Sequence, residues 1–174
     1  MAVPVVKLRG PEQAVGLAER VWPCYQDVFG DFEDFASWRS DMFDRHVARD
    51  GYRLAVAFDG HTVAGFSWGY VGRRGQYWTD LVCQALPRNV ADEWVGDHFE
   101  FVELGVSPAY RRQGLGRRLH DTLLAGIGQR CLLSTEDDPQ DPAVRLYRSS
   151  GWSKLGVLRP GVQVMGRKPA EYLT

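Results

Sequence analysis

Apolar and polar residues alternate along this chain in blocks that predict both helices and strands. Apolar residues recur at helical spacing over residues 11–22, within 24–47, and over 115–127 and 143–150, which predicts helices there. Runs rich in β-branched and aromatic residues predict strands at 3–8, 52–58, 62–71, 99–106, 131–135, 152–158 and 162–165. The pattern therefore predicts an α/β fold with a mixed, mostly antiparallel central sheet of about six to seven strands, flanked by helices.

Proline and glycine mark several boundaries between these elements. Pro23 is expected to end or kink the first helix, because proline lacks a backbone N–H. Asp59-Gly60 between two apolar runs predicts a hairpin. The order strand, helix, strand from Glu100 to Thr135 predicts the one parallel element of the sheet. Residues 76–97 have the weakest periodicity, and they could form either a plain core helix or a lid over a binding site.

Length and composition indicate one globular domain over residues 1–174. A chain of 174 residues with 44% hydrophobic residues is long enough for a sizeable core. The net charge of −1 gives no general attraction for nucleic acid, so we expect no nucleic-acid partner. No apolar stretch approaches the roughly 20 residues of a membrane span, and the first residues lack the apolar core of a signal peptide.

Cysteine usage indicates a reducing compartment. Cys24, Cys83 and Cys131 are odd in number and lack the spacing of a metal site. We therefore expect a cytoplasmic protein with no disulfide and no metal.

The most informative stretch joins the strand at 99–106 to the helix at 115–127. A helix N-terminus carries partial positive charge and favours Asp or Glu, yet this one is rich in arginine. Gly114 and Gly116 leave the free N–H groups of the first helical turn open to a close approach. A bound anion in front of this helix end would offset the repulsion between the arginines and the positive end of the helix. The stretch therefore predicts a phosphate or pyrophosphate site. The arginines are Arg111, Arg112, Arg117 and Arg118.

Two other interpretations apply to the same stretch. A Gly-x-Gly beside arginine is often an ordinary solvated loop. A dinucleotide fold has an acidic residue about 20 positions further on, where Glu136 stands. However, Leu119 occupies the third glycine position, and the turn over residues 107–113 is too long for a tight strand-to-helix turn.

The run from Leu104 to Leu119 resembles the signature motif of the GNAT superfamily of acyl-CoA-dependent N-acetyltransferases, with Arg111, Gly114 and Gly116 at its defined positions. Residues 142–152 resemble the second recurrent motif of that superfamily. The resemblance implies a GNAT-like fold that binds acetyl-CoA. Gln140 stands where the superfamily often has asparagine, which puts its contact to the cofactor in doubt. The cofactor-binding residues that it implies are Leu104, Val106, Arg111, Arg112, Gln113, Gly114, Leu115, Gly116, Arg117, Gln140 and Tyr147.

Acetyl transfer to an amine needs a base for the amine and an acid for the thiolate. An alkylamine has a pKa near 10.4, so a carboxylate must assist its deprotonation at neutral pH. Glu103 in the central strand is the first candidate, on the same face as Phe101 and Gly105 by strand alternation, and Glu100 is the second. Tyr147 occupies the tyrosine position of the second motif, which the resemblance implies to be the general acid; it could also be an ordinary core tyrosine.

An acceptor site for a cation is expected in the acidic and aromatic stretch of residues 24–47. Its acids could line a cleft for a protonated amine with cation–π contacts, or they could form the solvated face of an amphipathic helix. The candidates are Asp27, Asp31, Glu33 and Asp34.

Together these features predict an enzyme that transfers the acetyl group of acetyl-CoA to a primary amine, by direct attack in a ternary complex. The acceptor could be a small amine, a polyamine, an aminoglycoside, an amino acid or a protein N-terminus. An alternative is a non-catalytic acyl-CoA-binding regulatory protein that keeps the pyrophosphate site but does not transfer the acyl group to an acceptor. A homodimer is possible, although no heptad pattern specifies one.

Overall fold

The computed structural model describes residues 2–169, which divide into two compact units. The first unit contains the residues up to Tyr70 and Val102–Ala125, and the second contains Val71–Phe101 and the residues from Gly126 onward. Strands β3 (Thr62–Gly72) and β4 (His98–Val106) each continue from one unit into the other. The single domain over residues 1–174 stays a prediction, and residues 1 and 170–174 lie outside the described part of the chain.

The strands of residues 2–169 form one seven-stranded sheet in the order β1-β2-β3-β4-β5-β7-β6. β4 and β5 run parallel, with Phe99 opposite Cys131, whereas the registered pairs β1–β2, β2–β3, β5–β7 and β6–β7 are antiparallel. The mostly antiparallel sheet and its parallel element are thus confirmed. The remaining strands are β1 (Val5–Arg9), β2 (Arg53–Asp59), β5 (Cys131–Glu136), β6 (Ser153–Arg159) and β7 (Val162–Arg167).

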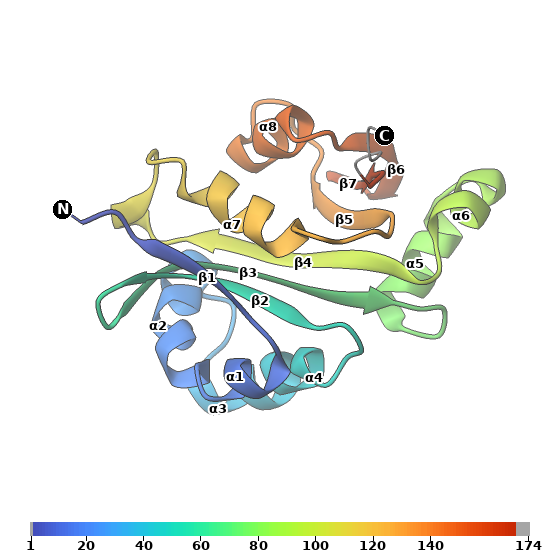
Figure 1. Ribbon diagram of the computed structural model, residues 1–174. Helices are drawn as coiled ribbons and strands as arrows, with labels where there is room; N and C mark the ends of the chain where they lie inside the picture. The colour runs from blue at the N-terminus through green and yellow to red at the C-terminus, as the bar shows by residue number, and fades with distance from the viewer. Residues whose placement is uncertain (1, 170–174) are drawn as a thin grey trace. The chain divides into compact units, whose positions relative to one another are not determined.

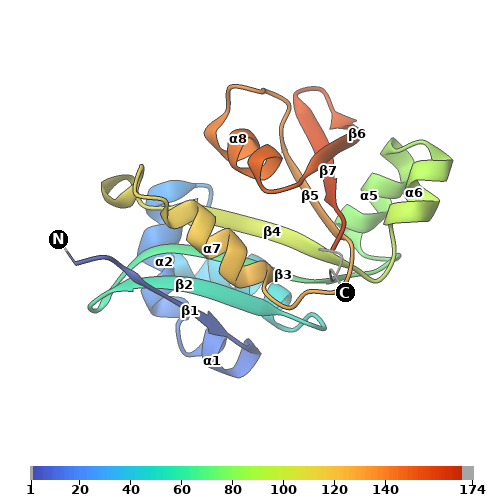
Figure 2. The same cartoon turned by 45° about the horizontal axis from the view of Figure 1, so that its top comes forward.

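In the first unit, helices cover both faces of β1–β3. Figures 1 and 2 show α2 (Ala18–Val28) on one face and α7 (Leu115–Leu124) on the other. The α2 face is lined by large aromatic side chains, which bury the most apolar area per residue. With α2 lie α1 (Pro11–Val15), α3 (Phe35–Trp38), the π-helical turn η1 (Arg39–Phe43) and α4 (Asp44–Val47). The fully buried aromatic residues on this face include Tyr25, Trp38, Phe43, Phe66 and Trp68.

The predicted helix over residues 11–22 is wrong in its boundaries. It breaks at Gly16, and Pro23 lies inside α2 instead of ending a helix. The N–H of Leu17 donates to the carbonyl of Ala14 in a tight turn, and the carbonyl of Leu17 then accepts from Val21 and starts a new helix. Low helix propensity at glycine accounts for the position of the break. α7 likewise ends before the predicted residue 127, and Gly126 follows it in the left-handed region at φ 76°.

The second unit has its own core. Residues 76–97 form two helices, α5 (Tyr77–Ala85) and α6 (Arg88–Trp94), whose apolar side chains pack with Leu132 and Val164 of the sheet. The interpretation of this segment as core is therefore confirmed, and its role as a lid stays a prediction. α8 (Pro142–Ser149) contacts β5 in the same unit.

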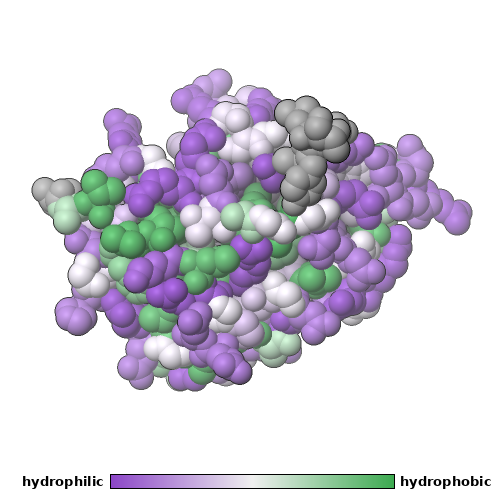
Figure 3. Space-filling view, viewed as in Figure 1, coloured by the Kyte–Doolittle hydropathy of each residue, from purple (hydrophilic) through white to green (hydrophobic). Residues whose placement is uncertain are grey.

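The surface of the described residues is mixed. Figure 3 shows hydrophobic patches near the N-terminal end of the chain, where Val3 and Val5 are exposed. No helix within residues 2–169 is long and apolar enough to cross a membrane. In the same range, no three His, Cys, Asp or Glu side chains are grouped so that they could hold a metal ion.

Candidate functional site

The turn between β4 and α7 is tied down on both sides. Within it lies the short 3-10 helix η2 (Pro108–Tyr110), and the hydroxyl of Tyr110 donates to Oδ2 of Asp59 at 2.7 Å. Nε of Arg111 donates to the carbonyl of Val106 at 3.0 Å, and Nη2 of Arg118 donates to the carbonyl of Pro4 at 2.9 Å. Arg111 and Arg118 therefore have structural contacts that hold the turn and the helix in place.

The backbone at the start of α7 is shaped to expose its N–H groups. Arg112 and Gly114 both adopt left-handed conformations, with φ of 60° and 72°. Gly114 is the N-cap of α7 and has no side-chain cap, and the first turn contains no acid. The first N–H groups of an α-helix have no partner within the helix. A Cβ added to Gly114 would meet no atom within 4 Å, so the space beside this N-cap residue is open.

This arrangement fits a diphosphate group. Arg112, Gln113, Gly114 and Arg117 are exposed, as contact with a large anionic ligand requires. Leu115 is buried, so only its backbone is available to a ligand. The predicted residues Leu104, Val106 and Gly116 are half-buried.

Glu103 lies near the aromatic face of α2. Its carbonyl accepts a hydrogen bond of 2.7 Å from the hydroxyl of Ser67, which anchors this point of β4 to β3. Burial raises the pKa of the Glu103 carboxyl to about 8, and the negative charge of Asp31 adds to the effect. Glu100, the second candidate base, is buried in the other unit, opposite Leu132 of β5.

Two residues of β4 next to Glu103 pack near α2. A Cβ on Gly105 would meet Phe66 and Val28, so Gly105 faces α2 together with Glu103, as predicted. Val102 also packs against the core cluster of the α2 face. The ring of Phe101 contacts Tyr147 in the second unit, and the common face of Phe101 and Glu103 stays a prediction.

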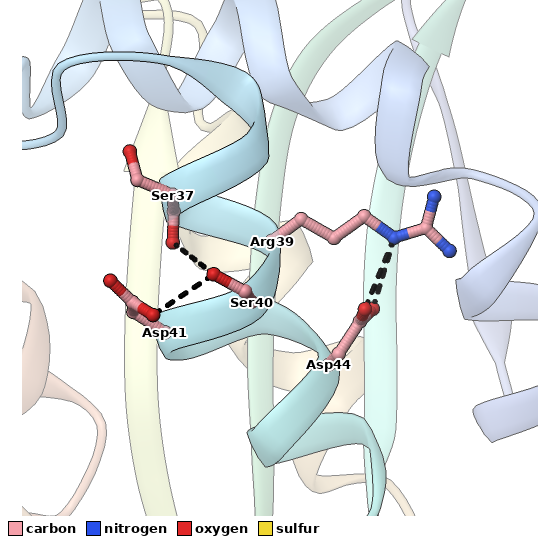
Figure 4. A network of polar contacts seen from close by, with 5 residues as sticks. All are labelled: Ser37, Arg39, Ser40, Asp41 and Asp44. Atoms are coloured by element: carbon pink, nitrogen blue, oxygen red, sulfur yellow. Dashed lines mark hydrogen bonds and ion pairs between the residues drawn. The ribbon is translucent and has the colours of Figure 1, made fainter.

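The acids of residues 24–47 have different neighbours. Asp34 is the N-cap of α3 and accepts from the N–H of Ser37 at 2.8 Å, which lowers its pKa. Figure 4 shows Arg39 of the π-helical turn paired with Asp44 of α4. Nε of Arg39 lies 3.2 Å from Oδ2 of Asp44. Asp31 instead accepts from the buried hydroxyl of Tyr25 at 3.3 Å. Tyr25 was indicated in the sequence only as one of many aromatic residues, and no spacing pattern links it to Asp31 or Glu103.

Tyr147 lies within an aromatic cluster of the second unit. α8 begins at its N-cap Asp141, whose side chain accepts from the N–H groups of Ala143 and Val144. Tyr147 is only 6% exposed, and its ring centre lies 5.7 Å from that of Phe101 and 5.9 Å from that of Trp152. The packing therefore fixes the position of the Tyr147 ring.

Gln140 precedes α8 and is exposed. Its side-chain oxygen accepts from Nη2 of Arg145 at 2.6 Å. Its backbone N–H donates to Oδ1 of Asp138 at 2.8 Å. The amide oxygen of Gln140 is thus held within its own turn.

Comparison with known proteins identifies relatives of this chain. The profile of the Acetyltransferase (GNAT) family matches residues 15–152. The GCN5-like protein acetyltransferase of Mycobacterium tuberculosis is 36% identical over 156 residues, which cover 85% of this chain and 72% of that protein.

Two solved structures share the fold. The PaiA N-acetyltransferase of Thermoplasma acidophilum, in complex with coenzyme A, has a TM-score of 0.57 at 15% identity and covers 95% of this chain and 99% of its own. The ribosomal-protein-S18-alanine N-acetyltransferase of Escherichia coli has a TM-score of 0.62 at 17% identity, and the match covers 98% of this chain and 99% of that one. At these identities the likeness concerns the fold alone.

Proposed function

Because the chain belongs to the Acetyltransferase (GNAT) family, we propose that it transfers the acetyl group of acetyl-CoA to a primary amine by direct attack in a ternary complex. When bound, acetyl-CoA supplies an activated acetyl thioester. The observation that carries the proposal is the start of α7. The backbone there is left-handed at Arg112 and Gly114, and the first helical turn has arginine where a helix N-terminus favours an acid.

The proposed cofactor contacts come from this turn and from the strand before it. Free N–H groups at the start of α7 hold the pyrophosphate, and the exposed arginines neutralise its charge. The backbone N–H of Val106 polarises the thioester carbonyl. The residues are Leu104, Val106, Arg111, Arg112, Gln113, Gly114, Leu115, Gly116 and Arg117, with Gln140 and Tyr147 from the second motif.

Glu103 is the proposed general base. A carboxyl group with a pKa of about 8 is matched to proton transfer near neutral pH. It takes the proton that the attacking amine must lose. Tyr147 is the proposed general acid, whose hydroxyl gives a proton to the departing sulfur.

The acceptor is proposed as a class, namely a primary amine on a small molecule, a peptide or a protein. The name of the Mycobacterium tuberculosis relative supports an amine on a protein. We place the reaction in the cytoplasm, since Cys24, Cys83 and Cys131 are all free thiols. A homodimer remains part of the proposal.

The test is calorimetric titration with acetyl-CoA, followed by measurement of CoA release in the presence of a polyamine, an aminoglycoside, an amino acid and a peptide with a free N-terminus. The proposal expects acetyl-CoA binding and turnover with at least one acceptor class. It also expects that Glu103→Gln binds acetyl-CoA normally and that Tyr147→Phe, which keeps the ring, binds it within a few-fold, while both variants lose turnover about 100- to 10,000-fold. Binding of acetyl-CoA without turnover of any amine would favour the non-catalytic regulator. Absence of acetyl-CoA binding would refute both the acetyltransferase and the regulator.

A further inference from the structure

A depression on the surface of the first unit collects positive charge that no acid offsets. Its volume is about 420 Å³, which lies within the range of small-molecule sites. Among residues 2–169, no Asp or Glu side chain lines it. The lining includes three cationic side chains, Lys7, Arg9 and Arg20, and three apolar ones, Val5, Leu17 and Phe58.

One side of the depression is formed by β1, the outermost strand of the sheet. In the antiparallel β1–β2 pair, Val5 lies opposite Phe58 and Lys7 lies opposite Val56. Paired residues of neighbouring strands project from the same face of a sheet. Val56 is buried in the core of the α2 face, so Val5 and Lys7 project from that face too. Arg9 joins them because side chains alternate along a strand with a period of two.

The other side comes from α2, and its cation is held in place. The chain passes from β1 through α1 into α2, where Arg20 reaches the same depression (Figure 1). Nε and Nη2 of Arg20 donate to the carbonyl of His61 at 3.2 and 3.0 Å, and Nη2 also donates to the carbonyl of Gly60 at 3.3 Å. Its Cζ atom lies 4.8 Å from the centre of the Phe58 ring. A side chain fixed in advance loses less entropy when a ligand binds.

The hydrogen-bonding capacity of these cations is only partly used. Within residues 2–169, Nη1 of Arg20 has no acceptor, and none of the three cations forms an ion pair. Arg9 donates to the carbonyl of its neighbour Leu8, at 3.1 Å. Lysine on an outer strand also prevents sheets from associating, but that role needs no cation fixed on a helix. Cations that converge from two elements indicate a ligand with anionic oxygens.

We propose that this depression between β1, α2 and the β2–β3 hairpin binds a small phosphate monoester that carries an apolar group. The phosphate accepts from Lys7, Arg9 and Arg20, and its charge of up to two offsets more of theirs than one carboxylate does. The apolar group covers Val5, which is 54% exposed, and the neighbouring Leu17. This site is independent of the proposed function, because its lining shares no residue with the proposed acetyl-CoA contacts.

The test is calorimetric titration of the wild-type protein with phenyl phosphate. Inorganic phosphate has the charge without the ring, and phenol has the ring without the charge. Phenyl phosphate is expected to bind at least about tenfold more tightly than either, because it alone contacts both the cations and the apolar side chains. Proton–nitrogen NMR should show that phenyl phosphate shifts the Nε signal of Arg20. Saturating acetyl-CoA should leave the affinity for phenyl phosphate unchanged.

Four variants separate the contributions. Lys7→Gln and Arg9→Gln should each weaken phenyl phosphate binding about three- to tenfold. Val5→Thr keeps the shape of the side chain, and it should weaken binding of phenyl phosphate but not of inorganic phosphate. Arg88→Gln is the matched control, since it removes an exposed cation of the other unit, and it should change neither. Urea unfolding checks that each variant is folded.

Three results would overturn the inference: no binding of phenyl phosphate to the wild-type protein, equal losses in Lys7→Gln and Arg88→Gln, or equal affinity for phenyl phosphate and for phenol. Displacement of phenyl phosphate by acetyl-CoA would overturn it too, since the phosphate would then lie at the start of α7. Normal phenyl phosphate binding in a wild-type protein that does not bind acetyl-CoA would support this site and refute only the proposed function.

Discussion

The ring of Phe66 lies directly against the α-carbon of Gly105, so closely that a Cβ at residue 105 would come within 2.7 Å of the Phe66 Cζ atom. Phe66 in turn stacks on Tyr25, whose hydroxyl holds Asp31. The missing side chain at Gly105 therefore allows β4 to approach the aromatic layer in which Glu103 is placed.

Replacement of Gly105 by alanine should destabilise the first unit. The new methyl group would overpack Phe66, which costs about 1–3 kcal/mol in the free energy of unfolding. Gly128→Ala is the matched control, since a Cβ there meets no atom within 4 Å. Urea unfolding followed by tryptophan fluorescence measures both variants. Equal stability of the two would contradict the packing described here.

Replacement of Gly114 by glutamate should weaken acetyl-CoA binding at least about tenfold, or ~1.4 kcal/mol. The carboxylate would occupy the open space in front of the N–H groups and repel phosphate. Gly126→Glu is the control for backbone strain, because Gly126 at the other end of α7 has a similar φ, 76° against 72°, and equally open surroundings. Calorimetry should find normal affinity in the control. Equal losses in both variants would place the diphosphate elsewhere.

The contribution of Glu103 to the stability of the protein should fall as pH rises from about 4.5 to about 8. The pKa of this carboxyl is about 8 in the folded protein against an ordinary value of 4.5, so between these values the folded state binds the additional proton. Each pH unit in the interval lowers the free energy of unfolding by at most about 1.4 kcal/mol. Glu103→Gln should lack this slope, so its stability relative to the wild-type protein should increase from about pH 5 to about pH 9 in urea titrations.

Two histidines should destabilise the folded state in acid. Burial lowers the pKa of His46 and of His98 from 6.5 to about 4. Nδ1 of His46 accepts from Nε1 of Trp68 at 3.1 Å, and Nδ1 of His98 accepts from the N–H of Gly96, so both rings are neutral. The unfolded chain binds these protons first, so the contribution of the two histidines to stability should decrease as pH falls from 6.5 toward 4. Imidazole proton NMR should give midpoints near 4 for both rings, and a midpoint near 6.5 would refute the burial argument.

The three thiols should differ in reactivity. Cys24 and Cys131 are buried, and burial raises the pKa of each thiol. Cys83 is half-buried and should be modified first by a disulfide reagent in the native protein. Cys83→Ser should remove the fast phase of labelling, whereas Cys24→Ser should leave it. A fast phase that persists in Cys83→Ser would show that one of the buried thiols is accessible.

Local patterns in the sequence were sufficient to predict the strands, the hairpins and the cofactor turn. The alternation and turn residues at 52–71 predict β2 and β3 because a hairpin forms between neighbours in the chain. The turn from Ser107 to Gly116 is predictable for the same reason, since arginines and glycines at a helix N-terminus act on groups within a few residues. Its role in binding acetyl-CoA stays a prediction.

The tertiary structure decided which acids share an environment. Asp31 and Glu103 are 72 positions apart in the numbering, and no sequence period relates them. They act on one another because Gly30 turns the chain after α2 and because Tyr25 stacks on β3, both of which depend on packing between distant segments. For the same reason the contact between Phe101 and Tyr147 could not be predicted from the sequence: strand alternation is local, whereas the side chain that a residue meets depends on its neighbours in space.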